Sequence, residues 1–146
     1  MDGCCRRSRN KSDTADRVKV STFRIGSPVR RGKELRIGAT RLPPRGVPKA
    51  RWKRDGYFDV WFPNVAPTRE LLAWIRQRDI NDEQVRINFF RRYERELLRT
   101  PDARHAINLL AEISTRTPIS VGCFCRDESR CHRSVLRRVI EQAAGG

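Results

Sequence analysis

The sequence lacks any apolar run close to the roughly 20 residues of a membrane-spanning helix, and its first residues, MDGCCRRSRNKSD, lack the apolar centre of a signal peptide. Acidic residues are also few, with 17 Asp and Glu against 32 Lys and Arg, so that the net charge is +15. We therefore expect a cytoplasmic protein without a membrane partner. The charge by itself favours a polyanionic partner, which can be a nucleic acid, an anionic membrane surface or a phosphate-bearing ligand, without choosing among them.

Cysteine is present, but its distribution is unlike that of a secreted disulfide framework. The five cysteines are an odd number and form two clusters, one at Cys4 and Cys5 and the other at Cys123, Cys125 and Cys131. Reduced thiols fit this pattern better than disulfides.

The 146 residues, 38% of them hydrophobic, are about one domain long. Residues 1–17 are polar and aperiodic, which predicts a flexible basic arm. We expect a single domain over 18–143 and a short tail over 144–146. The positive charge is concentrated in residues 24–54, which hold eleven basic residues and one acid. Proline and glycine interrupt this stretch, so it should form strands and exposed loops.

Apolar spacing predicts a small α/β domain. Alternating residues favour strands over 18–25 and 35–41, which we expect to pair antiparallel, and the aromatic residues of the connection 42–67 must pack against the core. Helical spacing and capping signals predict helices over 68–78, 83–99, from Pro101 to before Pro118, and 131–143, with Thr68 and Asp82 as caps. A short apolar run predicts a buried strand over 119–125. We therefore expect a partly parallel sheet flanked by about four helices, with a functional loop between the last strand and the last helix.

This loop carries most of the reactive side chains. Its sequence over 123–134 is CFCRDESRCHRS. With Ser129 as a helix N-cap, free amides of the last helix and the guanidinium groups of Arg126, Arg130 and Arg133 would bind a phosphate, sulfate or carboxylate. The same positive field would lower the pKa of a nearby thiol.

Three interpretations of the loop are open. A zinc site would use Cys123, Cys125, Cys131 and His132, although the usual C-x2–4-C pair is missing. A rhodanese- or phosphatase-like thiol enzyme would use Cys125 or Cys123 as nucleophile and His132 as base, although the phosphatase signature C-x5-R is not met at Cys125. In the third interpretation, Cys123 packs in the strand, Cys131 and His132 cap the helix, and the arginines face solvent. The residues predict no cofactor other than this zinc, and they do not decide whether the protein is an enzyme.

Four short motifs, taken in order, resemble the YeaO-like family, known as domain of unknown function 488. They are LRIGATRLPPRGV at 35–47, VAPTREL at 65–71, FRRYEREL at 90–97 and CHR at 131–133. The resemblance covers about residues 18–140. It implies one small α/β domain, a basic Arg-Leu-x-Pro-Arg-Gly segment and a Cys-His-Arg loop near the C-terminus, but no known activity.

The chain departs from the family pattern at three positions. Thr40 stands where the family has an aspartate, Pro43 where it has a tryptophan, and Cys125 where one branch has a glutamate. Any role that the family's aspartate has is therefore absent at Thr40, and the site that the resemblance implies is altered in this chain.

The resemblance and the predicted strand ends together favour one pocket formed by the basic segment and the Cys-His-Arg loop. Our leading hypothesis is a module that binds a phosphate-bearing ligand, nucleotide or nucleic acid, and the alternatives are the thiol enzyme and the zinc site. We expect the anion to be bound by Arg41, Arg45, Arg126, Arg130, Cys131 and Arg133.

Overall fold

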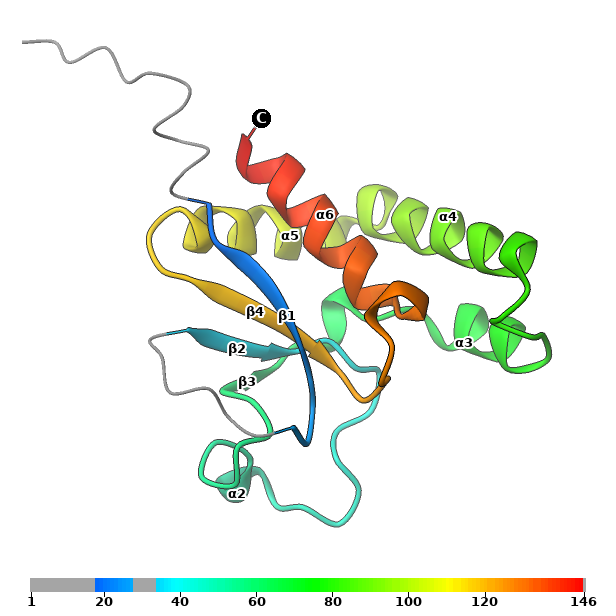
Figure 1. Cartoon of the computed structure of the whole chain (residues 1–146). Helices are drawn as coiled ribbons and strands as arrows, with labels where there is room; N and C mark the ends of the chain where they lie inside the picture. The colour runs from blue at the N-terminus through cyan, green and yellow to red at the C-terminus, as the bar shows by residue number, and fades with distance from the viewer. Residues whose placement is uncertain (1–17, 28–33, 146) are drawn as a thin grey trace, which may run out of the picture.

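The structure of the protein is a computed structural model that describes residues 18–27 and 34–145 (Figure 1). The arm expected over 1–17, with Cys4 and Cys5, lies outside the described residues, as does Gly146. The expected α/β fold is confirmed for the rest of the chain.

The described residues form one sheet of four parallel strands in the order β1-β4-β2-β3. The strands are β1 (Val20–Arg24), β2 (Leu35–Gly38), β3 (Val60–Trp61) and β4 (Ile119–Cys123). The antiparallel pairing predicted for the first two strands is wrong, because each pairs parallel with β4 and not with the other. All five residues of β4 are buried, the pattern of a strand covered on both faces, and such a strand takes the centre of a parallel sheet.

The four main helices form where the sequence predicted them. They are α3 (Arg69–Arg76), α4 (Glu83–Arg99), α5 (Pro101–Ser114) and α6 (His132–Gly145). Thr68 caps α3 by accepting a hydrogen bond from the backbone of Leu71, and Asp82 caps α4 by accepting bonds from the backbone N–H groups of Gln84 and Val85. The last helix begins one residue later and ends two residues later than predicted, and it includes positions 144 and 145.

The connection over 42–67 contains short elements of secondary structure that the sequence pattern did not predict. It holds the short helix α2 (Lys49–Trp52), strand β3 and the 3-10 turn η1 (Pro63–Val65). Its aromatic residues pack as expected: the Trp52 ring lies 5.2 Å from that of Phe58 and 6.1 Å from that of Trp61, between centroids.

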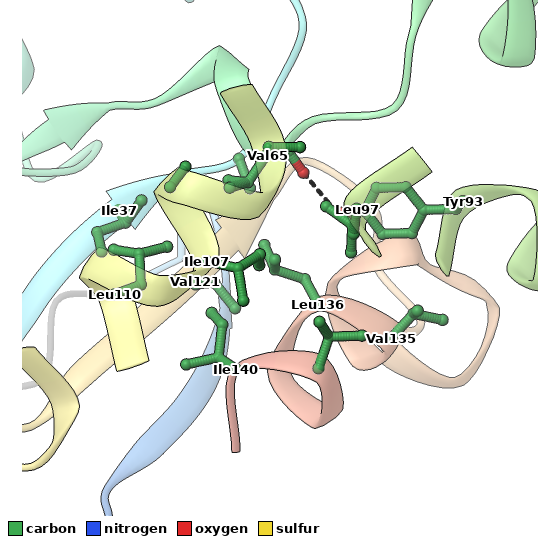
Figure 2. Close-up of a cluster of buried hydrophobic side chains, with 14 of the residues drawn as sticks. Ile37, Val65, Tyr93, Leu97, Ile107, Leu110, Val121, Val135, Leu136 and Ile140 are labelled. Carbon is green, nitrogen blue, oxygen red and sulfur yellow. Dashed lines mark hydrogen bonds between the residues drawn. The ribbon is translucent and has the colours of Figure 1, made fainter. Parts of the chain in front are cut away.

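The hydrophobic core lies between the sheet and the helices α4, α5 and α6, which gather on one side of it (Figure 1). Figure 2 shows its centre, where side chains of β2, β4 and the three helices meet around Ile37, Val121, Ile107, Leu136 and Leu97. Tyr93 of α4 is buried at the edge of this cluster, and its hydroxyl donates a hydrogen bond to the carbonyl oxygen of Val65.

None of the helices in the described part of the chain has the length and apolar character required to cross a membrane.

Candidate functional site

A pocket of about 750 Å³ opens where β2 and β4 end. Because neighbouring parallel strands end at the same edge of a sheet, the segment after Gly38 and the loop after Cys123 meet there. The lining comes from the basic segment, from α3 and from the cysteine loop: Thr40, Arg41, Leu42, Pro43, Pro44, Arg45, Pro67, Arg69, Leu72, Arg76, Cys123, Phe124 and His132. The pocket therefore contains two of the expected anion ligands together with a candidate nucleophile.

Arginine provides the charge of this pocket, and the described residues that line it include no acid. Arg41 is held in place because its Nε and Nη2 atoms each donate a 3.0 Å hydrogen bond, to the carbonyl oxygens of Pro67 and Ala66. Arg45 is exposed. The other two arginines, Arg69 and Arg76, were not among the predicted site residues.

The sequence did contain a signal for these two residues of α3. Arg69, Leu72 and Arg76 are spaced i, i+3 and i+7, so they occupy one face of the helix. That face borders the pocket. Helical spacing of arginine around an apolar residue could therefore have added α3 to the predicted site.

Three thiols lie together at the inner edge of the pocket. The sulfur atoms of Cys123, Cys125 and Cys131 all lie within 4.8 Å of one another, and the first two are 3.7 Å apart. All three are free cysteines. Cys123 and Cys131 are buried and Cys125 is exposed, so one side of the cluster is open to solvent.

Hydrogen bonds within the cluster favour a thiolate at Cys123. The side-chain hydrogen bonds that this sulfur shares with Cys125 and then with Cys131 lower the pKa of Cys123, and backbone N–H groups of Cys125 and Phe124 act in the same direction. The pKa values of Cys125 and Cys131 are raised, in each case chiefly by the hydrogen bond to Cys123. The cluster therefore favours one thiolate, at the cysteine that lines the pocket, over two or three.

His132 is buried at the start of α6 and makes its contacts away from the sulfur of Cys123. Its Nε2 atom lies 2.8 Å from the carbonyl oxygen of Ala39, which requires Nε2 to donate. The Nδ1 atom is 3.8 Å from the sulfur of Cys131. Burial lowers the pKa of His132 and so favours the neutral ring. The ring packs in a T-shaped arrangement with the ring of Tyr93, at 5.3 Å between centroids.

Arg133 is the one charged side chain that is buried in the described part of the chain, at 4% exposure. Its Nη1 atom donates a 2.6 Å hydrogen bond to the carbonyl oxygen of Cys125, and its Nε atom has no partner among the described residues. Arg133 lies behind the loop and does not line the pocket.

The remaining predicted anion ligands are also outside the pocket lining. Arg126 is exposed, and Arg130 pairs with Asp127 at 3.5 Å and donates to the side chain of Asn81. The prediction of Ser129 as N-cap is wrong. A 3-10 turn, η2 (Glu128–Arg130), precedes α6, and the backbone N–H of Ser129 donates to Asp127 within that turn.

The sequence matches a family model described as the active DUF488-N3 subclade over residues 20–144. The chain belongs to the DUF488 family. The resemblance to the YeaO-like family that the motifs indicated is therefore confirmed. A search of curated proteins and a search of solved structures each found no match. Within this DUF488 domain, the pocket and the thiol cluster are the features from which a function can be argued.

Proposed function

We propose that this DUF488 domain binds a small phosphate-bearing ligand in the pocket at the ends of β2 and β4. The observation that carries the proposal is the lining itself, which contains four arginines and no acid among the described residues. Guanidinium groups match phosphate oxygens in geometry and charge, and arginine is the residue most used for such recognition. Arg41 and Arg45 from the basic segment would contact the phosphate, together with Arg69 and Arg76 from α3.

The apolar part of the lining supports a ligand larger than phosphate alone. Leu42, Leu72 and Phe124 lie among the arginines with three prolines, and Phe124 is 46% exposed. A planar or apolar group could pack on this surface while the phosphate is held by arginine. The pocket volume of about 750 Å³ also lies in the range of small-molecule sites. These features favour a nucleotide-sized ligand over a long nucleic acid.

Calorimetric titration with AMP and adenosine tests the proposal. AMP is expected to bind and adenosine to bind at least about tenfold more weakly, since a hydrogen bond to a charged group contributes about 1.5–3 kcal/mol. Arg45→Ala and Arg69→Ala should each weaken AMP binding by a similar factor. Both side chains are exposed, so neither substitution should impair folding.

Arg104→Ala is the matched control, because Arg104 is an exposed residue of α5 outside the pocket and its loss changes the net charge equally. AMP binding by this variant should equal that of the wild type. Equal weakening in all three variants would refute a defined site. Tight binding of an oligonucleotide with a steep dependence on salt, without AMP binding, would indicate a nucleic-acid partner instead.

A thiol-dependent enzyme is the second candidate function. It is favoured by Cys123, whose sulfur borders the pocket and whose pKa is lowered by the hydrogen bond from Cys125. The contacts of His132 with Ala39 and Cys131 give less support to its predicted role as the base. Rapid alkylation of Cys123 by iodoacetamide well below pH 8, slowed by AMP, is the result that this function requires.

A further inference from the structure

We propose that Cys123, Cys125 and Cys131 form a binding site for one thiophilic metal ion of the Zn²⁺ type at the edge of the pocket. The three residues come from the end of β4, from the loop and from the position before α6, and the fold brings their sulfur atoms within 4.8 Å of one another. This site is separate from the arginines of the proposed anion site.

The spacing of the sulfur atoms fits a tetrahedral zinc ion. Two thiolates bound at 2.3 Å with tetrahedral angles are about 3.8 Å apart. The sulfur atoms of Cys123 and Cys125 are 3.7 Å apart. The sequence spacing of these cysteines does not match the usual zinc motifs, but the third thiol, from Cys131, completes a three-sulfur face.

The buried charge of Arg133 supports an anionic cluster beside it. An isolated buried cation is costly unless a negative charge lies near it. Arg133 makes no direct ion pair with a described carboxylate; the nearby Asp127, on which its charge acts, pairs with Arg130. Arg133 donates instead to the backbone of Cys125, a member of the cluster. Three thiolates and one Zn²⁺ ion carry a net charge of −1, the same as the single thiolate favoured in the metal-free cluster. Binding of the ion would therefore leave the charge beside Arg133 unchanged.

The donor set is three thiols and does not include His132. The group of mutually close ligand atoms contains the three sulfurs only, and the Nε2 atom of His132 is used by Ala39. A zinc ion with three protein ligands keeps a fourth position for water or a ligand. Because Cys123 borders the pocket, this position would be accessible from it, and the exposed Cys125 provides a route for the ion to enter.

The metal site and the nucleophile are mutually exclusive uses of Cys123. A nucleophile requires one activated sulfur, whereas the structure brings three together next to a buried cation. The observations therefore favour the metal.

Titration of the full-length, reduced protein with Co²⁺, followed by competition with Zn²⁺, tests the site. We expect one equivalent of Co²⁺ to give a sulfur-to-cobalt charge-transfer band and the strong visible bands of tetrahedral coordination, both removed by Zn²⁺. Cys125→Ser should weaken Zn²⁺ binding more than about 100-fold, the upper end of the loss caused by removing an outer-shell partner. Cys125 is exposed, so this variant should fold.

The matched control is Cys4→Ser combined with Cys5→Ser, which removes two thiols and leaves the cluster intact. This variant should bind Co²⁺ like the wild type. The proposal is overturned if folded wild-type protein gives no charge-transfer band, or if the control loses the band while Cys125→Ser keeps it. Fast alkylation of Cys123 that is unchanged by Zn²⁺ would also overturn it and would favour the nucleophile. None of these readouts depends on AMP binding, so the two proposals can fail separately.

Discussion

Replacing Tyr93 by phenylalanine removes one hydroxyl group from the edge of the core and nothing else. Tyr93 and Val65 are both fully buried, and the hydroxyl donates to the carbonyl oxygen of Val65. Phenylalanine has the same shape, so no cavity larger than the hydroxyl is formed. The carbonyl of Val65 would lose this partner in a place that water does not reach.

The expected cost follows from that lost partner. A buried polar group left without a hydrogen bond costs about 1–3 kcal/mol. We therefore expect Tyr93→Phe to lower the free energy of unfolding by about 1–3 kcal/mol. For a chain of this length, the melting temperature should fall by about 3 °C for each kcal/mol.

Urea denaturation followed by circular dichroism measures this change, and the chain supplies a matched control. Tyr57, the other tyrosine, is half-buried, and its hydroxyl makes no side-chain hydrogen bond within the described residues. Tyr57→Phe should change the free energy of unfolding by less than about 0.5 kcal/mol. If the two variants are equally stable, the hydrogen bond to Val65 does not contribute as argued and the reasoning is refuted.

Two further predictions concern the sheet and the buried histidine. A Cβ atom at Gly38 would lie 2.6 Å from the ring of buried Phe58, so Gly38→Ala should lower the free energy of unfolding by about 1–3 kcal/mol, as measured by urea denaturation. The control is Gly145→Ala, whose Cβ atom would meet nothing within 4 Å and which should change this free energy little. Burial lowers the pKa of His132, so as the pH falls this side chain is protonated in the unfolded chain before it is protonated in the folded one. The free energy of unfolding should therefore be retained above about pH 6.5 and should fall below that pH, by up to about 1.4 kcal/mol per pH unit. His132→Gln should reduce this slope, and an unchanged slope in this variant would contradict the assignment.

The helices could be predicted closely because their boundaries are set by local chemistry. Asp82 accepts hydrogen bonds from the first turn of α4, and α4 spans the same residues, 83–99, that the sequence predicted. Thr100 and Pro101 mark the next start in the same way. Such signals involve residues within one turn of each other, so they are visible without knowledge of the fold.

Strand pairing could not be predicted from the same kind of signal. The strands β1 and β2 are close in sequence, which favoured a direct pair, but their common partner β4 begins at Ile119. Nothing in the alternation of residues 18–25 identifies a partner almost one hundred positions away. The continuous burial of β4 was the available clue, since a strand without a polar face belongs at the centre of a sheet.

The part of the candidate site that lies at the ends of the strands could be predicted from the sequence. Arg41, Arg45 and Cys123 follow from the expectation that both segments end at one edge of the sheet, and the structure brings them to one pocket. Arg126 and Arg130 lie elsewhere, because the loop turns through η2 and directs Arg130 toward Asp127. A loop conformation depends on such contacts, which the order of the residues does not reveal.

Arginine and lysine contribute differently to this domain, although each adds one positive charge. Arg41 donates to the carbonyl oxygens of Pro67 and Ala66 from two separate nitrogen atoms, and Arg133 is buried while it donates to Cys125. A lysine ammonium group is a compact and strongly hydrated charge that does not reproduce this fork. By contrast, exposed pairs between charged side chains contribute little to stability. The net charge of +15 is therefore less informative about this domain than the planar donor geometry of these two arginines.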